Sequence, residues 1–356
     1  MFEETRLKLA RARRGLTAKA LAERAEVSVD TIKRLEKGRN DPEPQTVEKL
    51  ARALGYPEEF FFGAKVEAVD AGAVSFRSFS KMTAKERDAS LGAGSVGLLL
   101  SCWVEERFGL PEPQLIDLSY ESDPEVAAAH IRQYWSLGQQ PITDLLALLE
   151  TKGIRLFSLT ENTASVNAFS FWRGGKPFMF LNNFKTAESS RFDAAHELAH
   201  LVMHMHGDPK KGRNVEREAN TFASAFLMPA EDVKARVPRR ITTDVVIRAK
   251  ARWRVSAMAM AYRLHQLNRL SEWQYKSICI DLTKRGYRTG EPSGMSREKS
   301  KVWRQVLTML WKERVTKADI ADELGLPLDE VEGLIWSLTA QDIGIERQER
   351  GSLQAI

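Results

Sequence analysis

Two histidines and a glutamate at one fixed spacing constrain this chain more than any other feature. His196 and His200 stand four residues apart in His-Glu-Leu-Ala-His, with Glu197 directly after the first, and four of the six histidines fall between 196 and 206. Residues i and i+4 of a helix project from the same face, so both imidazoles can reach one metal ion while Glu197 overhangs it. The spacing therefore predicts a helix that carries a zinc site.

A carboxylate beside such a metal suits peptide hydrolysis. Zinc lowers the pKa of its bound water from about 16 to about 7, and a neighbouring glutamate can accept the proton when water attacks a carbonyl. We predict Zn²⁺ as the cofactor and Glu197 as the catalytic base, on a helix that begins near Ser189-Ser190 and ends at Gly207-Asp208-Pro209. The competing interpretation is an ordinary amphipathic helix whose histidines bind no metal.

Catalytic zinc usually has three protein ligands, so a third residue is needed. The candidates are His206, Glu216 and Glu218. His206 lies ten residues beyond His196, which is the metzincin spacing, but Met203 stands where that class needs glycine. Glu216 begins a second predicted helix on which Asn220, four residues later, shares its face. We predict Glu216 as the ligand and Asn220 as a group that supports the site without binding metal.

These motifs resemble a known peptidase family. His-Glu-Leu-Ala-His-Leu-Val-Met-His at 196–204, followed by Glu-Arg-Glu-Ala-Asn-Thr-Phe-Ala-Ser-Ala-Phe-Leu-Met-Pro at 216–229, is similar to the ImmA/IrrE family of bacterial and phage metallopeptidases. The similarity extends over residues 140–232. Family members often have glycine where this chain has Ala199, a change between two small residues.

The resemblance implies an α+β zincin-like domain of the gluzincin type. In it, His196, His200 and Glu216 would bind zinc, and Glu197 would be the base. His204 recurs in such sequences; its expected role is a hydrogen bond to the site, and the alternative is a solvated histidine. Family members cleave repressor proteins, so the implied substrate is a repressor-like protein.

Short strands are predicted before the zinc helix. Gly153–Leu159, Ala168–Trp172 and Phe178–Leu181 have the expected composition, and Gly174-Gly175 supplies a hairpin turn. An edge strand beside a zinc helix can pair with an extended substrate through its main chain. The alternative is that these strands only pack beneath the helix.

The N-terminus carries a second, independent signature. Ala22 stands where two helices cross, a turn passes through Glu26, Ser28 caps the next helix, and Gly38 ends it. Together with the segment Arg39–Gly55, this pattern is similar to the XRE-type (Cro-like) domain of lambda-repressor-like regulators, and the similarity extends over residues 5–63. The resemblance implies a five-helix helix-turn-helix domain that binds a double-stranded DNA operator.

The helix from Ser28 would lie in the major groove, with its early residues at base edges. The residues that would face DNA are Lys19, Ser28, Val29, Asp30, Thr31, Lys33 and Arg34, with Arg39 near a phosphate. Asp30 is the unusual member, because a carboxylate accepts a hydrogen bond from cytosine N4 but repels phosphates.

The charge of this N-terminal segment is modest for a DNA-binding domain. Residues 1–65 contain 14 basic and 11 acidic side chains, a net charge of +3. We therefore expect phosphate contacts from local clusters such as Arg11, Arg13 and Arg14. The alternative is a domain retained for protein interaction.

At 356 residues, the chain is long enough for two or three domains, mainly α with a small β-sheet. We expect a DNA-binding domain over 1–65, a linker and helical region over 66–139, the peptidase domain over 140–270, and a helical region over 271–356. The third is expected to end in a helical pair, Thr243–Trp253 and Ser256–Leu267.

The C-terminal region holds another helix-turn-helix pattern at Thr316–Leu326. Its second helix would carry Asp329, Glu330 and Glu332, and such acidic side chains argue against contact with DNA. We expect a dimerisation or docking module there.

Composition limits the class of protein. Hydrophobic residues make up 43% of the chain, and no apolar run approaches the about 18 residues of a membrane span. No signal peptide begins the sequence, and the two cysteines, Cys102 and Cys279, are expected to be reduced thiols in the cytoplasm.

Three functions are compatible with these observations. The first is a DNA-binding regulator whose zinc endopeptidase domain cleaves a repressor or another regulatory protein. The second is a transcription factor that uses the peptidase fold as a metal or ligand sensor, and the third is an interaction protein such as an antitoxin or phage repressor. The complete set of ligands with Glu197 favours the first. The expected partners are a DNA operator, a protein substrate and a second copy in a homodimer, with no membrane.

Overall fold

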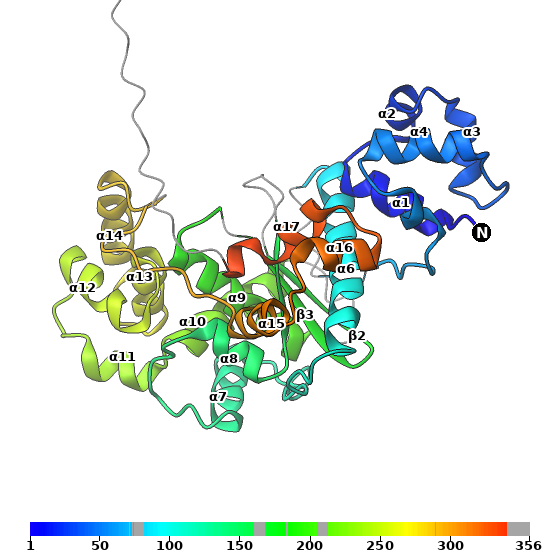
Figure 1. Cartoon of the computed structure of the whole chain (residues 1–356). Helices are drawn as coiled ribbons and strands as arrows, with labels where there is room; N and C mark the ends of the chain where they lie inside the picture. Colours follow the sequence, from blue (N-terminus) through cyan, green and yellow to red (C-terminus); the bar gives the residue numbers. More distant parts are fainter. Residues whose placement is uncertain are drawn as a thin grey trace, which may run out of the picture.

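The chain is mainly helical, with one small mixed sheet (Figure 1). The computed structural model describes residues 1–70, 72, 74, 82–159, 168–182, 184–204, 213–288 and 290–339. Within these ranges, no helix is long and apolar enough to cross a membrane. The predicted combination of many helices with a small sheet is confirmed.

The N-terminal part consists of four α-helices and one short 3-10 helix: α1 (Glu4–Arg13), α2 (Ala18–Arg24), α3 (Val29–Leu35), α4 (Pro44–Leu54) and η1 (Glu58–Phe62). Thr17 and Ser28 cap α2 and α3 through their hydroxyls. Glu26, at φ 53°, turns the chain between these two helices. A fifth α-helix was predicted, but Pro57 and Gly63 leave only five residues between them, enough for a 3-10 turn.

Three strands form the sheet in the order β1-β3-β2. β1 (Arg155–Leu159) is parallel to β3 (Lys176–Asn182), and β2 (Phe169–Arg173) is antiparallel to β3. Gly174 and Gly175 both take positive φ angles in the hairpin, as the predicted turn requires. The predicted strands are therefore confirmed, with β2 at one edge.

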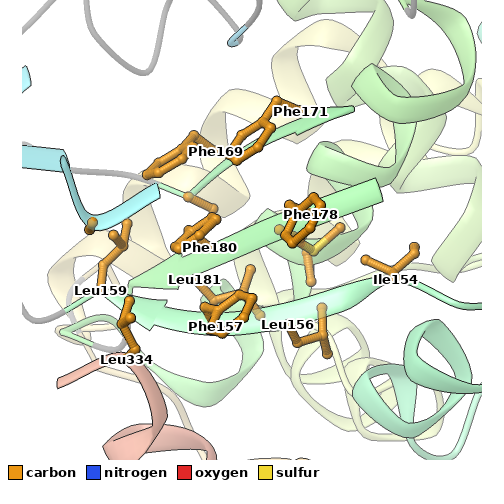
Figure 2. Close-up of a cluster of buried hydrophobic side chains, with 14 of the residues drawn as sticks. Ile154, Leu156, Phe157, Leu159, Phe169, Phe171, Phe178, Phe180, Leu181 and Leu334 are labelled. Atoms are coloured by element: carbon orange, nitrogen blue, oxygen red, sulfur yellow. The ribbon is translucent and has the colours of Figure 1, made fainter. Parts of the chain in front are cut away.

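One face of the sheet is lined by stacked aromatic rings. Figure 2 shows these side chains together: Phe157, Phe169, Phe171, Phe178 and Phe180. Side chains alternate along a strand, so Ser170 and Trp172 of β2 point to the opposite face. That face packs against α9 (Ala187–Met203), the helix that carries the histidine motif.

The remaining helices surround this sheet and extend from it. They are α6 (Ala84–Glu105), α7 (Pro124–Tyr134), α8 (Leu145–Thr151), α10 (Arg213–Leu227), α11 (Ala230–Arg236), α12 (Thr243–Trp253), α13 (Ala257–Gln266), α14 (Glu272–Lys284), α15 (Lys301–Lys312), α16 (Lys317–Leu324) and α17 (Leu328–Thr339). α12 and α13 form the helical pair predicted from the sequence. α10 lies beside α9 and completes the surroundings of the motif.

The C-terminal helix α17 lies between the sheet and the N-terminal helices (Figure 1). Its apolar face packs on β1, where the hydroxyl of Ser158 donates to the carbonyl of Gly333 at 2.8 Å. One turn earlier, Glu330 accepts hydrogen bonds from Tyr56 at 2.8 Å and from Arg13 at 2.8 Å. The acidic helix therefore docks within its own chain.

This docking corrects one expectation about DNA contact. Arg13 and Arg14 were predicted to bind phosphates, but Arg14 instead forms a bidentate pair with Asp329, at 2.7 and 3.2 Å. Arg11 pairs with Glu36 within the N-terminal part, at 2.5 Å. All three guanidinium groups of the predicted cluster therefore contact carboxylates of the same chain.

Candidate metal centre and nucleic-acid interface

Helix α9 holds the motif in a nearly fully buried position. The helix is capped three residues before Ser189, because the hydroxyl of Thr186 accepts a hydrogen bond from the Ser189 N–H at 3.2 Å. It ends at Met203, and the predicted stop at Gly207-Asp208-Pro209 lies outside the described residues. Fully buried apolar side chains surround the motif and fix the helix: Ala194, Ala195, Leu198, Ala199 and Val202.

Three side chains converge on one point between α9 and α10. The Nε2 atoms of His196 and His200 are 3.1 Å apart, and they lie 3.4 and 3.7 Å from carboxylate oxygens of Glu216. All ligand atoms of this group fall within 4.8 Å of one another, and among the described residues it is the group of His, Cys, Asp or Glu side chains that could hold a metal ion. The structure thus brings together the predicted donors, whereas His206 lies outside the described part of the chain.

The hydrogen bond of His196 fixes which of its nitrogens carries the proton. Its Nδ1 lies 3.1 Å from Oδ1 of Asn220, an oxygen that can only accept. Nδ1 therefore carries the hydrogen, and Nε2 presents a lone pair toward His200 and Glu216. Asn220 contacts His196 through the ring nitrogen that lies away from Glu216, and its supporting role stays a prediction.

A longer hydrogen-bond series fixes the tautomer of His200. Its Nδ1 lies 3.0 Å from Nδ1 of His204, and Nε2 of His204 lies 3.2 Å from the carboxylate of Glu218. The carboxylate accepts from His204, which in turn accepts from His200, so that Nε2 of His200 also carries a lone pair. Glu218 is therefore a supporting group two contacts away from the cluster, a role that the sequence did not indicate.

This donor set fits a cation. Two imidazole lone pairs and a carboxylate face the same point, and no donor hydrogen on these groups is directed there. Burial, with the neighbouring imidazoles, lowers the pKa of His200 well below its usual value, which favours the neutral ligand form. Burial also lowers the pKa of His196, but Glu216 and Glu197 outweigh that effect and raise it overall. A bound divalent cation would oppose protonation of this imidazole.

Glu197 lies beside the cluster and is almost completely buried, at 2% exposure. Burial raises its pKa to about 7, against the opposing influence of His196. Its Oε2 accepts a hydrogen bond from the hydroxyl of Ser170 on β2, at 2.8 Å. Sequence reasoning missed Ser170, because alternation along the strand places it on a face but does not say which helix covers that face.

The surface predicted to face DNA is on and around α3. Figure 1 shows α3 at the outer end of the N-terminal part, away from α16 and α17. Val29 and Thr31 are half-buried, and the other predicted DNA-facing residues are exposed. The hydroxyl of Ser28 accepts from the Thr31 N–H at 3.0 Å, so it serves as the helix cap. Asp30 forms an ion pair with Arg34 one turn later.

Two family models match separate parts of this chain. A helix-turn-helix domain matches residues 5–59, and an IrrE N-terminal-like domain matches residues 149–265. No curated protein matches the chain. The protein thus carries a helix-turn-helix domain, which implies DNA binding, followed in the middle of the chain by a metallopeptidase-like domain with a candidate His/His/Glu metal site.

Proposed function

We propose that this protein is a DNA-binding transcriptional regulator whose middle domain is a zinc-dependent endopeptidase of the gluzincin type. We further propose that it cleaves a repressor or another regulatory protein. The observation that carries the proposal is the convergence of two imidazole lone pairs and the Glu216 carboxylate beside the buried Glu197. A sensor without hydrolytic activity would have no need of a carboxylate at that position.

Each side chain of the site has a different role in the proposed peptide hydrolysis. His196, His200 and Glu216 would hold Zn²⁺, which when bound polarises the substrate carbonyl and acidifies the attacking water. Glu197 would accept a proton from the attacking water and would pass it to the leaving amine. Without a bound ion, burial raises the pKa of Glu197 to about 7, and a bound Zn²⁺ would lower it and favour the ionised carboxylate that a base requires.

The supporting groups keep the ligands in their binding form. Asn220 holds the proton of His196 on Nδ1, and the His204–Glu218 pair does the same for His200. Outer groups of this kind orient imidazole ligands and raise their affinity for metal.

On the DNA side, the exposed cations are the best supported contacts. Lys33 and Arg39 make no ion pair in the described part of the chain, and Arg34 pairs only with its neighbour Asp30. We propose that these residues, with Lys19, Ser28, Val29 and Thr31, line the interface with an operator. A homodimer is proposed because helix-turn-helix regulators bind paired half-sites as dimers. We also propose the domain limits 1–65, 66–139, 140–270 and 271–356, and action in the cytoplasm.

The base assignment is tested with Glu197→Gln. This variant keeps both imidazoles and Glu216, so it should bind zinc with unchanged stoichiometry while cleaving none of the regulatory proteins encoded by neighbouring genes. Wild-type protein loaded with zinc serves as the positive control. Undiminished cleavage by the variant would remove Glu197 from this role, and a zinc-loaded wild type that cleaves nothing would favour the sensor function.

The ligand assignment is tested by chelator competition. Glu216→Ala should lose zinc affinity by the largest factor, because it removes a ligand. Glu218→Ala should cost about tenfold, because it removes only support for His204. Should His206→Ala instead be the variant that loses the metal, the site is metzincin-like and the present assignment is wrong.

A further inference from the structure

Two side chains of strand β2 form hydrogen bonds with α9. The hydroxyl of Ser170 lies 2.8 Å from Oε2 and 3.2 Å from the backbone carbonyl oxygen of Glu197. The indole N–H of Trp172 donates to the carbonyl of Leu201 at 2.9 Å. The two contacted helix residues are four positions apart, so the strand holds α9 at two points one turn from each other.

The two residues differ in whether they contact a side chain of α9 or only its backbone. A serine hydroxyl has one hydrogen, and of its two acceptors the carboxylate oxygen is the nearer, at 2.8 Å against 3.2 Å for the backbone carbonyl oxygen. Ser170 is 3% exposed, so water does not readily replace it. Trp172 contacts only the backbone of α9, whereas Ser170 also holds the side chain of the proposed base.

A glutamate has a flexible side chain, and Glu197 has few other groups to fix it. Its carboxylate lies in a nearly dry environment where its hydrogen-bond partner strongly affects its orientation. With Oε2 held by Ser170, the other oxygen, Oε1, makes no hydrogen bond within the described part of the chain. The orientation of the carboxylate therefore depends on a residue from a different element of the fold.

We propose that Ser170 is a positioning residue for Glu197, and that its hydroxyl keeps the carboxylate in the one orientation that can exchange protons with water at the metal centre. The inference rests on the proposed function, because it assigns Ser170 a role through Glu197. Among the described residues, the hydroxyl of Ser170 hydrogen-bonds to Glu197 and to none of the proposed metal ligands.

The test compares two conservative variants of the zinc-loaded full chain. Ser170→Ala removes the contact to the base, and Trp172→Phe removes the matched contact to the same helix. We expect Ser170→Ala to lower kcat by about 10- to 100-fold with little change in KM or zinc affinity. Trp172→Phe should lower kcat far less. Equal losses in the two variants would mean that β2 acts only as a packing element, and an unchanged kcat in Ser170→Ala would also overturn the proposal.

A second measurement does not depend on cleavage. Crystal structures of the zinc-loaded wild type and Ser170→Ala should show one Glu197 rotamer in the first, with Oε2 bound by Ser170, and a displaced or divided side chain in the second. A zinc-loaded wild type without this contact would overturn the proposal, even if the alanine variant fails to fold. A wild type that keeps the contact but cleaves no protein would refute the peptidase function and leave the positioning role standing.

Discussion

The turn between α2 and α3 and the turn between α16 and α17 have the same backbone design but opposite surroundings. In each, a residue with positive φ comes after the first helix: Glu26 at 53° and Gly325 at 63°. The next N–H then bonds to the carbonyl five positions earlier, at 3.0 Å in the first turn and 2.8 Å in the second. Both are helix-turn-helix units as far as the backbone is concerned.

The second helices of these units differ in what they expose. On α3, the side chains of Asp30 and Arg34 are 63% and 57% exposed. On α17, Val331, Leu334 and Ile335 are buried, and Glu330 is 2% exposed under the N-terminal helices. The comparison teaches that the turn alone does not identify a DNA-binding unit, because the exposed face of the second helix decides what it can contact.

A third unit, α12–α13, supports the same conclusion. Arg254 takes φ 54° in its turn, and the following N–H bonds back five residues at 3.3 Å. Its second helix carries a fully buried Arg263, which donates to the carbonyl of Met228 at 2.9 Å and to Glu125 at 2.7 Å. Here an arginine on the second helix stabilises the fold and is not available to a phosphate.

The largest expected effect comes from breaking the buried contact of α17. Glu330→Ala leaves Arg13 and Arg14 with less counter-charge and Tyr56 without its acceptor, so we expect a loss of about 3–5 kcal/mol in the free energy of unfolding. Asp329→Ala is the matched control, because Asp329 is exposed and should cost at most about 1 kcal/mol. Urea denaturation measures both, and equal small losses would show that α17 does not hold the N-terminal domain.

The next largest effect is expected in DNA affinity, and it distinguishes exposed basic side chains from those that form ion pairs with α17. Lys33→Ala should weaken operator binding and reduce the slope of log affinity against log salt by about one, as expected for a lost phosphate contact. Arg14→Ala should leave that slope unchanged, because its guanidinium group binds Asp329 and not DNA. Filter-binding titrations at several salt concentrations decide between these outcomes, and a reduced slope for Arg14→Ala would restore the interpretation made from sequence.

The smallest effect is expected at Asp30. Its pair with Arg34 is exposed and one helical turn long, so Asp30→Ala should change stability by only about 0.5 kcal/mol. If the carboxylate contacts cytosine, the variant should lose about 1–3 kcal/mol of discrimination at one base pair. If it only repels phosphates, affinity should rise for all sequences by an amount that shrinks with salt. Binding to single-base operator variants at two salt concentrations separates the two, and no change in either would place α3 outside the groove.

Local sequence patterns predicted the features that lie within one helix or within two consecutive strands. The i, i+4 rule placed His196 and His200 together, and strand composition with a glycine pair located the hairpin. The cap of α9 was placed three residues late, because Thr186 and the serines at 189 and 190 are equally good capping types and sequence alone cannot rank them.

Contacts between distant elements could not be predicted in this way. Periodicity gives α17 an apolar face but does not show that it packs on β1, or that Glu330 meets Arg13, more than 300 positions away. Ser170 was missed for the same reason, and Glu218 was considered only as a metal ligand and not as a partner of His204. Each supports the site through a partner on another element, and a single sequence carries no record of that pairing.

The docking of α17 has a geometric consequence for encounters between molecules. This helix is packed on the sheet near its middle, and its first turn is bound to the domain that would lie on DNA. A flexible tether would let the metal centre sweep a volume around an operator. With α17 docked as described, the two parts would move together, so the helical phase of a bound DNA site would set the direction in which the candidate metal centre points.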